Sequence, residues 1–200
     1  MRLDHLVISC ETLEEGAAAV EETLGVRPVA GGKHAFMGTH NMLLSLGPEA
    51  YLEVIAVDPD APAPGHARWF ALDAFKGPPR LTNWVARCDN LEAALAAAPP
   101  VQGAISELSR GALRWRMLVV ENGRLPFDGC YPGLIQWQGA HPASLLPDVG
   151  LRLNRLTLTH VKALKLRPFL RDFETVRVVE GAKAGLVGDI ATPGGAVLLA

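Results

Sequence analysis

Apolar and polar residues alternate at the start of the chain, over residues 3–10, as they do in a strand that buries one face. An amphipathic helix follows, with apolar residues at helical spacing: Leu13, Ala17, Val20 and Leu24. Gly25 then supplies the residue type that commonly ends a helix. Three further apolar runs, separated by turn residues, read as strands at residues 29–37, 40–46 and 51–57. The pattern predicts a unit in the order strand, helix and three strands.

The same order returns from residue 81 and, in a shorter form, from residue 153. The second unit has a predicted helix at residues 91–98 and strands at residues 81–88, 104–109, 113–120 and 133–138. The third has strands at residues 153–159, 175–179, 185–190 and 196–199 and a helix at residues 166–173, in which Pro168 fits only the first turn. A Pro-rich connection with a short helix, residues 59–79, joins the first two units. We therefore predict a domain at residues 1–142, made of units 1–58 and 80–142, and a third unit at residues 150–200.

The composition permits a buried core and disfavours two classes of partner. The chain is 49% hydrophobic and 20% charged, and 19 basic against 21 acidic residues give a net charge of −2. Because no run of Lys or Arg is present, we expect no nucleic-acid or membrane partner. Three cysteines without a Cys-x-x-Cys pair predict neither a disulfide framework nor a structural zinc site. No apolar stretch is long enough for a membrane span, and the first residues lack a secretory pattern, so we expect a cytoplasmic protein.

The alternation places His5 and Glu53 on matching faces of two strands. The opposite faces, which include Leu6 and Leu52, are apolar and should pack on the helix. If the two strands belong to one sheet, an imidazole and a carboxylate converge in a cavity. Such donors suit Zn, Fe(II), Mn, Ni or Co, and from the residues alone a hydrogen-bonded His–Glu pair is the alternative.

The repeated units and several short motifs resemble the vicinal oxygen chelate superfamily, and more narrowly a glyoxalase-like group within it. The motifs are Leu-Asp-His-Leu-Val at residues 3–7, Gly-Gly-Lys-His at 31–34, Gly-Thr-His-Asn at 38–41 and Tyr-Leu-Glu-Val-Ile-Ala at 51–56. The resemblance implies an α+β fold, in which tandem βαβββ units form curved mixed sheets around a cavity and the helices lie on the outer faces. It also implies a divalent metal on the concave face and, since many relatives pair units between chains, a homodimer.

The family's metal-binding His and Glu fall on His5 and Glu53. In the second unit we take Asn83 and Gln136 as their counterparts, at positions where metal-bearing members usually have His and Glu. Neutral amides are weak ligands through oxygen only. A site of this composition holds a divalent ion loosely, or has lost it.

Other polar residues are candidates for catalysis and substrate binding. His34 and His40 flank a turn in the best-matching segment, and imidazoles suit proton transfer near neutral pH; a solvated turn is the alternative. Asn41 follows and is a candidate substrate contact. Arg114 and Arg116 share one strand face, so both lie in the cavity, where they would bind a carboxylate or phosphate, or both lie on the surface.

Two function classes remain after the nucleotide-binding and hydrolase motifs are found to be absent. The first is a divalent-metal-assisted enzyme of the isomerase, lyase or dioxygenase type that acts on a small oxygen-rich substrate. The second is a metal-free protein that binds and sequesters a small molecule, as drug-resistance relatives do. His5, Glu53 and the paired histidines favour the enzyme, which we adopt as the prediction, whereas Asn83 and Gln136 favour the binding protein.

Overall fold

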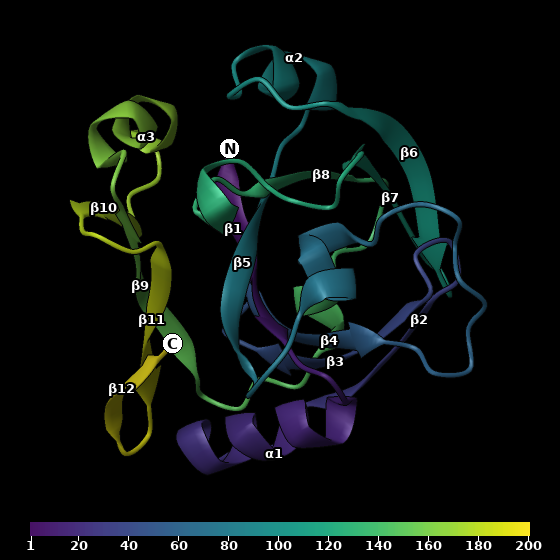
Figure 1. The fold of residues 1–200 in the computed structure, drawn as a ribbon. Helices are drawn as coiled ribbons and strands as arrows, with labels where there is room; N and C mark the ends of the chain where they lie inside the picture. Colours follow the sequence, from purple (N-terminus) through teal and green to yellow (C-terminus); the bar gives the residue numbers. More distant parts are fainter.

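The computed structural model describes residues 1–200, and it contains two sheets with helices on their outer sides (Figure 1). The first unit consists of β1 (Arg2–Ser9), α1 (Leu13–Leu24), β2 (Val29–His34), β3 (Thr39–Ser45) and β4 (Tyr51–Val57). The second consists of β5 (Arg80–Arg87), α2 (Leu91–Ala96), β6 (Gly103–Arg110), β7 (Leu113–Val120) and β8 (Gly133–Trp137). The third consists of β9 (Arg152–His160), α3 (Ala163–Leu170), β10 (Val176–Glu180), β11 (Gly185–Thr192) and β12 (Gly195–Leu199). The predicted element order and the α+β class are confirmed.

Helix α1 begins and ends as its sequence predicts. The Thr12 hydroxyl accepts a hydrogen bond from the backbone N–H of Glu15 (3.3 Å), which satisfies a donor that the first turn leaves free. Gly25 ends the helix with φ 73°, in the left-handed region that glycine adopts without strain.

Two shorter elements differ from the prediction. Helix α3 begins at Ala163, three residues earlier than predicted, so Pro168 lies inside it and not in its first turn. The connecting helix is a 3-10 segment at Trp69–Ala74, in which Phe70 (φ 59°) and Ala71 (φ 54°) adopt left-handed backbone angles. Short 3-10 turns also occur at Phe127–Gly129 and Pro142–Leu145.

The first two units form one eight-stranded sheet in the order β2-β3-β4-β1-β5-β8-β7-β6. Strand β1 pairs in parallel with β4 and antiparallel with β5, so the β1–β5 pair joins the units within a single chain. The sheet curves until its outermost strands, β2 and β6, lie in contact (Figure 1). This curvature creates a concave face, on which the site described below lies.

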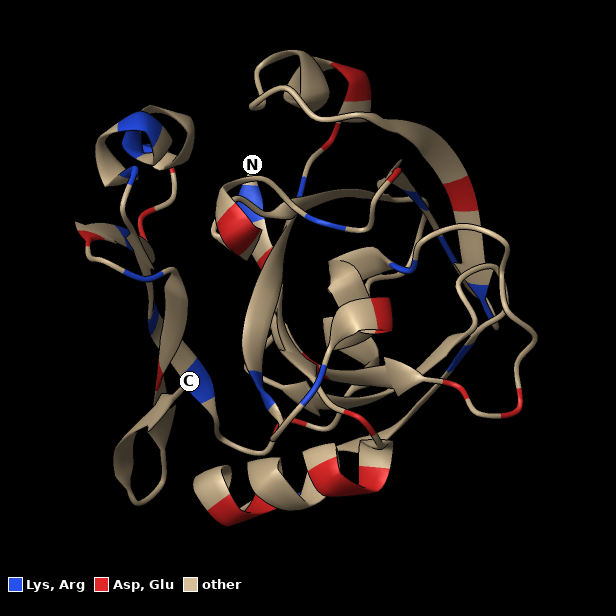
Figure 2. Cartoon of the chain, viewed as in Figure 1, with Lys and Arg blue, Asp and Glu red and all other residues tan.

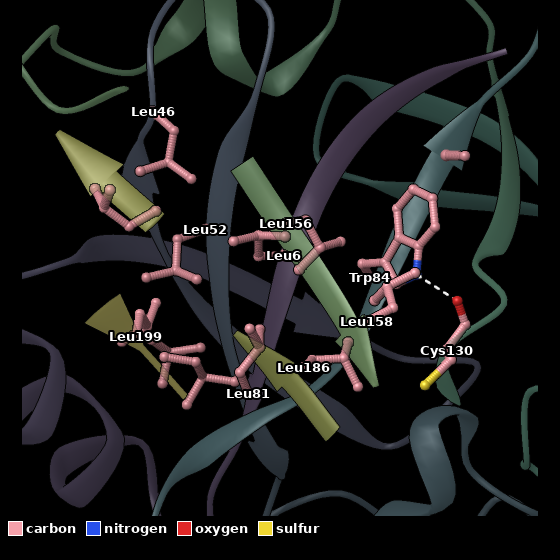
Figure 3. Packing of buried hydrophobic residues seen from close by; sticks show 14 of the residues in the cluster. Leu6, Leu46, Leu52, Leu81, Trp84, Cys130, Leu156, Leu158, Leu186 and Leu199 are labelled. Carbon is pink, nitrogen blue, oxygen red and sulfur yellow. Dashed lines mark hydrogen bonds between the residues drawn. The ribbon is translucent and has the colours of Figure 1, made fainter. Parts of the chain in front are cut away.

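The convex face is covered by α1, as expected, and also by the third unit. Figure 3 shows Leu6 and Leu52 of the large sheet against Leu156, Leu186 and other leucines of the sheet β10-β9-β11-β12. The two sheets approach closely at Gly188, where a Cβ atom would lie 3.2 Å from Leu6 Cδ1. The third unit therefore shares the main hydrophobic core of the molecule.

Figure 2 shows acidic residues along α1 and basic residues scattered over the other elements. No helix of the structure is long and apolar enough to cross a membrane.

Candidate functional site

A buried chain of charged side chains lies at the concave face of the large sheet. His5 Nδ1–H donates to Asp4 Oδ1 (2.6 Å), and His5 Nε2 lies 3.4 Å from Glu53 Oε2. An irregularity in the pairing of β1 with β5, between Leu3 and His5, lets neighbouring side chains point the same way. The His5 ring also stacks on Tyr51, its partner on β4, with ring centroids 4.5 Å apart. The predicted convergence of His5 and Glu53 is therefore observed, and Asp4 extends it.

Asp4 is fully buried and accepts three hydrogen bonds, which fix it as a carboxylate. Besides His5, the indole N–H of Trp137 and the Nε2–H of His141 donate to Asp4 Oδ2, each at 2.9 Å. His141 accepts the backbone N–H of Ala143 at Nδ1 (3.3 Å), which places its own proton on Nε2. Burial alone raises the pKa of Asp4, but the bonds from His141 and His5 outweigh it and hold the pKa well below its ordinary value.

The charges of His5 and Glu53 depend on each other. Burial lowers the pKa of His5, but its hydrogen bonds with Asp4 and Glu53 raise that pKa from 6.5 to about 9. Burial raises the pKa of Glu53, but His5 and the Asn41 amide lower it to about 2. At neutral pH the site therefore holds an imidazolium between two carboxylates.

Asn41 and His34 complete the polar side of the site. Asn41 Oδ1 accepts the backbone N–H of Gly32 (3.0 Å), so its Nδ2–H group faces Glu53 Oε1 and donates to it at 2.5 Å. His34 Nε2 accepts from Arg110 Nη1 (3.2 Å), which leaves its Nδ1–H to donate to Thr39 Oγ1 (3.0 Å). Burial lowers the pKa of His34 to about 4, so this imidazole is neutral.

These side chains surround a small pocket with a cavity volume of about 30 Å³. Polar contributions come from His5, Glu53, His34 and Arg110. The remaining wall is apolar and largely aromatic: Tyr51, Trp69, Phe70, Trp115, Met117, Ile135 and Trp137. A small, largely apolar pocket that opens to solvent and carries a few charged groups is a typical binding site for a small molecule.

Asn83 and Gln136, predicted as metal ligands, do not lie in this pocket. Asn83 is buried on β5 and lines a separate hollow beside Gly129. Gln136 points away from the concave face, where its Oε1 accepts from Arg116 (3.1 Å) and its Nε2 donates to the carbonyl of Asp89 (2.7 Å). The placement predicted for both residues was wrong.

The strand register explains this error. Val85 pairs with His5 across the β1–β5 junction and belongs to the apolar cluster on the concave side. Glu53 lies two residues past the β4 partner of His5, and Ile135 lies two residues past the β8 partner of Val85. The second unit thus has Val85 and Ile135 at the positions where the first unit has His5 and Glu53. When the two units are aligned by hydrophobic pattern alone, the strand register is unknown, and the alignment selects Asn83 and Gln136 instead.

Three other predicted residues also lie outside the pocket. His40 alternates with Asn41 on β3 and therefore faces outward, where its pKa is lowered by burial and it lies near Lys33 and Asp58. Arg114 donates only to the carbonyls of Gly111 and Leu113, and Arg116 pairs with Glu92 of α2 and with Gln136. Both arginines lie on the outer face because the apolar residues between them on β7 fill the concave face.

The sequence alone did not identify Asp4, Trp137 and Arg110 as part of the site. Asp4 directly precedes His5, so strict alternation would place its side chain on the opposite face of β1. The irregular pairing with β5 lets Asp4 face the same side as His5. Arg110 comes from the far end of the second unit and reaches His34 because the sheet curves back on itself. Neither feature has a local sequence signal.

The superfamily resemblance implies a divalent metal. Whether this site could hold one depends on the ligand atoms that its side chains offer. His5 and Glu53 offer two donor atoms, but no third His, Cys, Asp or Glu joins them in a group that could hold a metal ion. The Asn41 amide turns its N–H toward Glu53, and the Arg110 guanidinium lines the same pocket. A resident divalent ion usually takes three or four protein ligands, so this donor set does not fit one.

Comparison with known proteins places this geometry in a family. A family model described as a glyoxalase-like domain matches residues 3–172. No curated protein matches the chain. A solved structure of a hypothetical protein from Staphylococcus aureus, 14% identical, covers 92% of this chain and 87% of its own with a TM-score of 0.64, which shows a shared fold. Methylmalonyl-CoA epimerase from Mycobacterium tuberculosis is 18% identical over 72% of this chain and 91% of its own, with a TM-score of 0.46.

Proposed function

Since this chain belongs to the glyoxalase-like domain family of the vicinal oxygen chelate superfamily, we propose that its pocket binds a small oxygen-rich carbonyl compound and moves a proton at the carbon next to the carbonyl. The reaction is of the isomerase type. The proposal depends on one observation. The buried side chains of Asp4, His5 and Glu53 contact one another in that order, and the last two line the aromatic pocket.

His5 serves as the hydrogen-bond donor to the substrate carbonyl. Asp4 holds Nδ1–H, so the proton on Nε2 faces the pocket and Glu53. An imidazolium at this position stabilises the negative charge that develops on the carbonyl oxygen when the neighbouring carbon loses a proton. Asp4 keeps the ring oriented and charged, so we assign it a positioning role.

Glu53 serves as the base. In the free site its pKa is about 2 because His5 and Asn41 stabilise the carboxylate, and such a group is a weak base. When a substrate oxygen accepts a hydrogen bond from His5 Nε2–H, this N–H no longer faces Glu53. Glu53 then loses the hydrogen bond that most lowers its pKa. The basicity of Glu53 then rises at the moment when substrate is present, and the carbon-bound proton passes to its carboxylate.

The aromatic wall supports this chemistry by excluding water. Tyr51, Trp115 and Trp137 flank the charged groups, and His5, Glu53 and Tyr51 are each 5% exposed or less. Charge interactions are stronger in such surroundings than in water, because the effective dielectric constant is lower.

The proposed reaction requires no metal ion. Superfamily members commonly bind divalent metals, but here His5 and Glu53 are engaged as an ion pair, and His34 Nε2 accepts from Arg110. A homodimer and a cytoplasmic location, both predicted from the sequence, remain proposals.

A metal-free binding protein is the second candidate. The low pKa of Glu53 and the largely apolar wall favour it, because a pocket of this kind can retain a ligand without acting on it. The two candidates differ in whether a bound carbonyl compound exchanges its carbon-bound protons.

The test is deuterium exchange followed by NMR. Small 2-oxo acids, 2-hydroxy carbonyls and 1,2-dicarbonyls are incubated in D₂O with the wild type, with Glu53→Gln and with the matched control His40→Gln. The proposal expects at least one compound to exchange protons next to its carbonyl in the wild type and in His40→Gln, but not in Glu53→Gln. Binding without exchange in any compound would support the sequestering protein instead.

A further inference from the structure

Two residues that line the pocket carry unused hydrogen-bonding capacity: one is a cation without an anionic partner, and the other has a buried N–H without an acceptor. The cation is Arg110, which forms no ion pair with any carboxylate. The N–H belongs to the indole of Trp69, whose Nε1 is buried and makes no hydrogen bond. Buried donors without an acceptor are rare in folded proteins, so the Trp69 N–H needs an explanation, and the half-buried Arg110 lines the same pocket.

The chain holds Arg110 in a defined place. Arg110 lies at the end of β6 and crosses to β2, where the absence of a side chain at Gly32 leaves room for it; a Cβ there would lie 2.9 Å from Arg110 Cδ. Nη1 donates to His34 Nε2 at 3.2 Å, and this is its only side-chain hydrogen bond. A guanidinium carries five N–H donors, so most of them remain free for a ligand.

Trp69 lies next to the same imidazole. Its ring meets His34 edge-on, with centroids 5.1 Å apart, and it begins the strained 3-10 segment that forms one wall of the pocket. His34 thus accepts a hydrogen bond from Arg110 and packs against the ring of Trp69. Because His34 is neutral and its Nε2 accepts from Arg110, it orients the guanidinium without cancelling its charge.

From these contacts we infer that Arg110 and the Trp69 N–H form a carboxylate subsite, which makes the substrate a small carboxylate that also carries a carbonyl or hydroxyl oxygen. This inference rests on the proposed function and names its substrate class. A guanidinium binds a planar carboxylate through two parallel hydrogen bonds, and the indole N–H can donate to a remaining lone pair. The carbonyl of the same molecule then lies toward His5 and Glu53, which line the pocket with Arg110.

The test compares two probes of nearly equal shape, pyruvate and pyruvamide, by isothermal titration calorimetry. We expect the wild type to bind pyruvate at least about tenfold more tightly, because hydrogen bonds to charged groups are the stronger ones. Arg110→Met and Trp69→Phe should each reduce this preference, and Arg110→Lys should restore part of it. Arg114→Met, which removes an exposed arginine at the start of the next strand, should leave the preference unchanged.

The binding and exchange experiments can distinguish a failure of the carboxylate subsite from a failure of the proposed function. Equal binding of both probes by the wild type, or a preference that survives Arg110→Met in a variant with an unchanged thermal melt, would overturn the subsite. If deuterium exchange still occurs with neutral carbonyl compounds in that case, the proposed function stands without it. Failure to bind either probe overturns the subsite, and failure of exchange with every compound removes the proposed function as well.

Discussion

The charge of His5 makes a quantitative prediction about how stability depends on pH. The pKa of His5 rises from 6.5 in the unfolded chain to about 9 in the folded protein. A rise of this size corresponds to about 3 kcal/mol of stability, since each unit of pKa is about 1.4 kcal/mol. Because the folded state binds this proton more tightly, the contribution is complete below pH 6.5 and is lost as pH rises toward 9. About 2 kcal/mol of it should disappear between about pH 6 and pH 8.5.

Urea denaturation at these two pH values measures the effect. The informative quantity is the difference between the wild type and His5→Gln, because titrating groups that do not contact His5 contribute equally to both. The wild type should lose about 2 kcal/mol more than His5→Gln over this interval. His40→Gln is the matched control, since it removes an outward-facing histidine. It should lose at least as much stability as the wild type, because the lowered pKa of His40 makes its own contribution grow as pH rises. Parallel pH curves for the wild type and His5→Gln would refute the claim that His5 is an imidazolium.

Three further predictions follow from other contacts. Asp4→Asn should lower the pKa of His5, measured by NMR, and destabilise the fold by about 2 kcal/mol, because a charged partner of His5 becomes neutral. Gly188→Val should destabilise the protein by about 1–3 kcal/mol in urea titrations, because a Cβ at this position already lies 3.2 Å from Leu6 Cδ1; unchanged stability would mean that the two sheets separate easily. Elemental analysis of untagged protein should find no stoichiometric divalent metal, and a metal lost in both His5→Ala and Glu53→Gln would contradict our interpretation of the donors.

The element order could be predicted because it depends on local periodicity. The strands and α1 follow the alternation and helical spacing of their own residues, and Thr12 and Gly25 mark the ends of the helix. The position of the second sheet, formed by the third unit, could not be predicted in this way. Leu6 and Leu52 show only that their face is buried, and an apolar face gives no indication of whether a helix or a second sheet covers it.

The site was predictable where alternation alone decides it. His5 and Glu53 lie on adjacent parallel strands, two pairs from each other in register, so their convergence follows from the pattern once the sheet is assumed. Asp4 was missed because an irregular pairing overrides the alternation, and Gln136 was misplaced because a shift of one residue moves a side chain to the other face. Arg110 joins the site through the curvature of the whole sheet, which no local pattern encodes.

The most direct test of the account is an NMR titration of His5 in ¹⁵N-labelled protein, with and without added Zn²⁺. The account predicts that both ring nitrogens carry protons throughout the neutral range, that the pKa lies near 9, and that Zn²⁺ leaves the spectrum unchanged. A neutral ring at pH 7 whose Nε2 signal shifts on stoichiometric Zn²⁺ would contradict it. In that case the Asp4–His5 pair would be a supported metal ligand, and the proton-transfer roles assigned to His5 and Glu53 would fail.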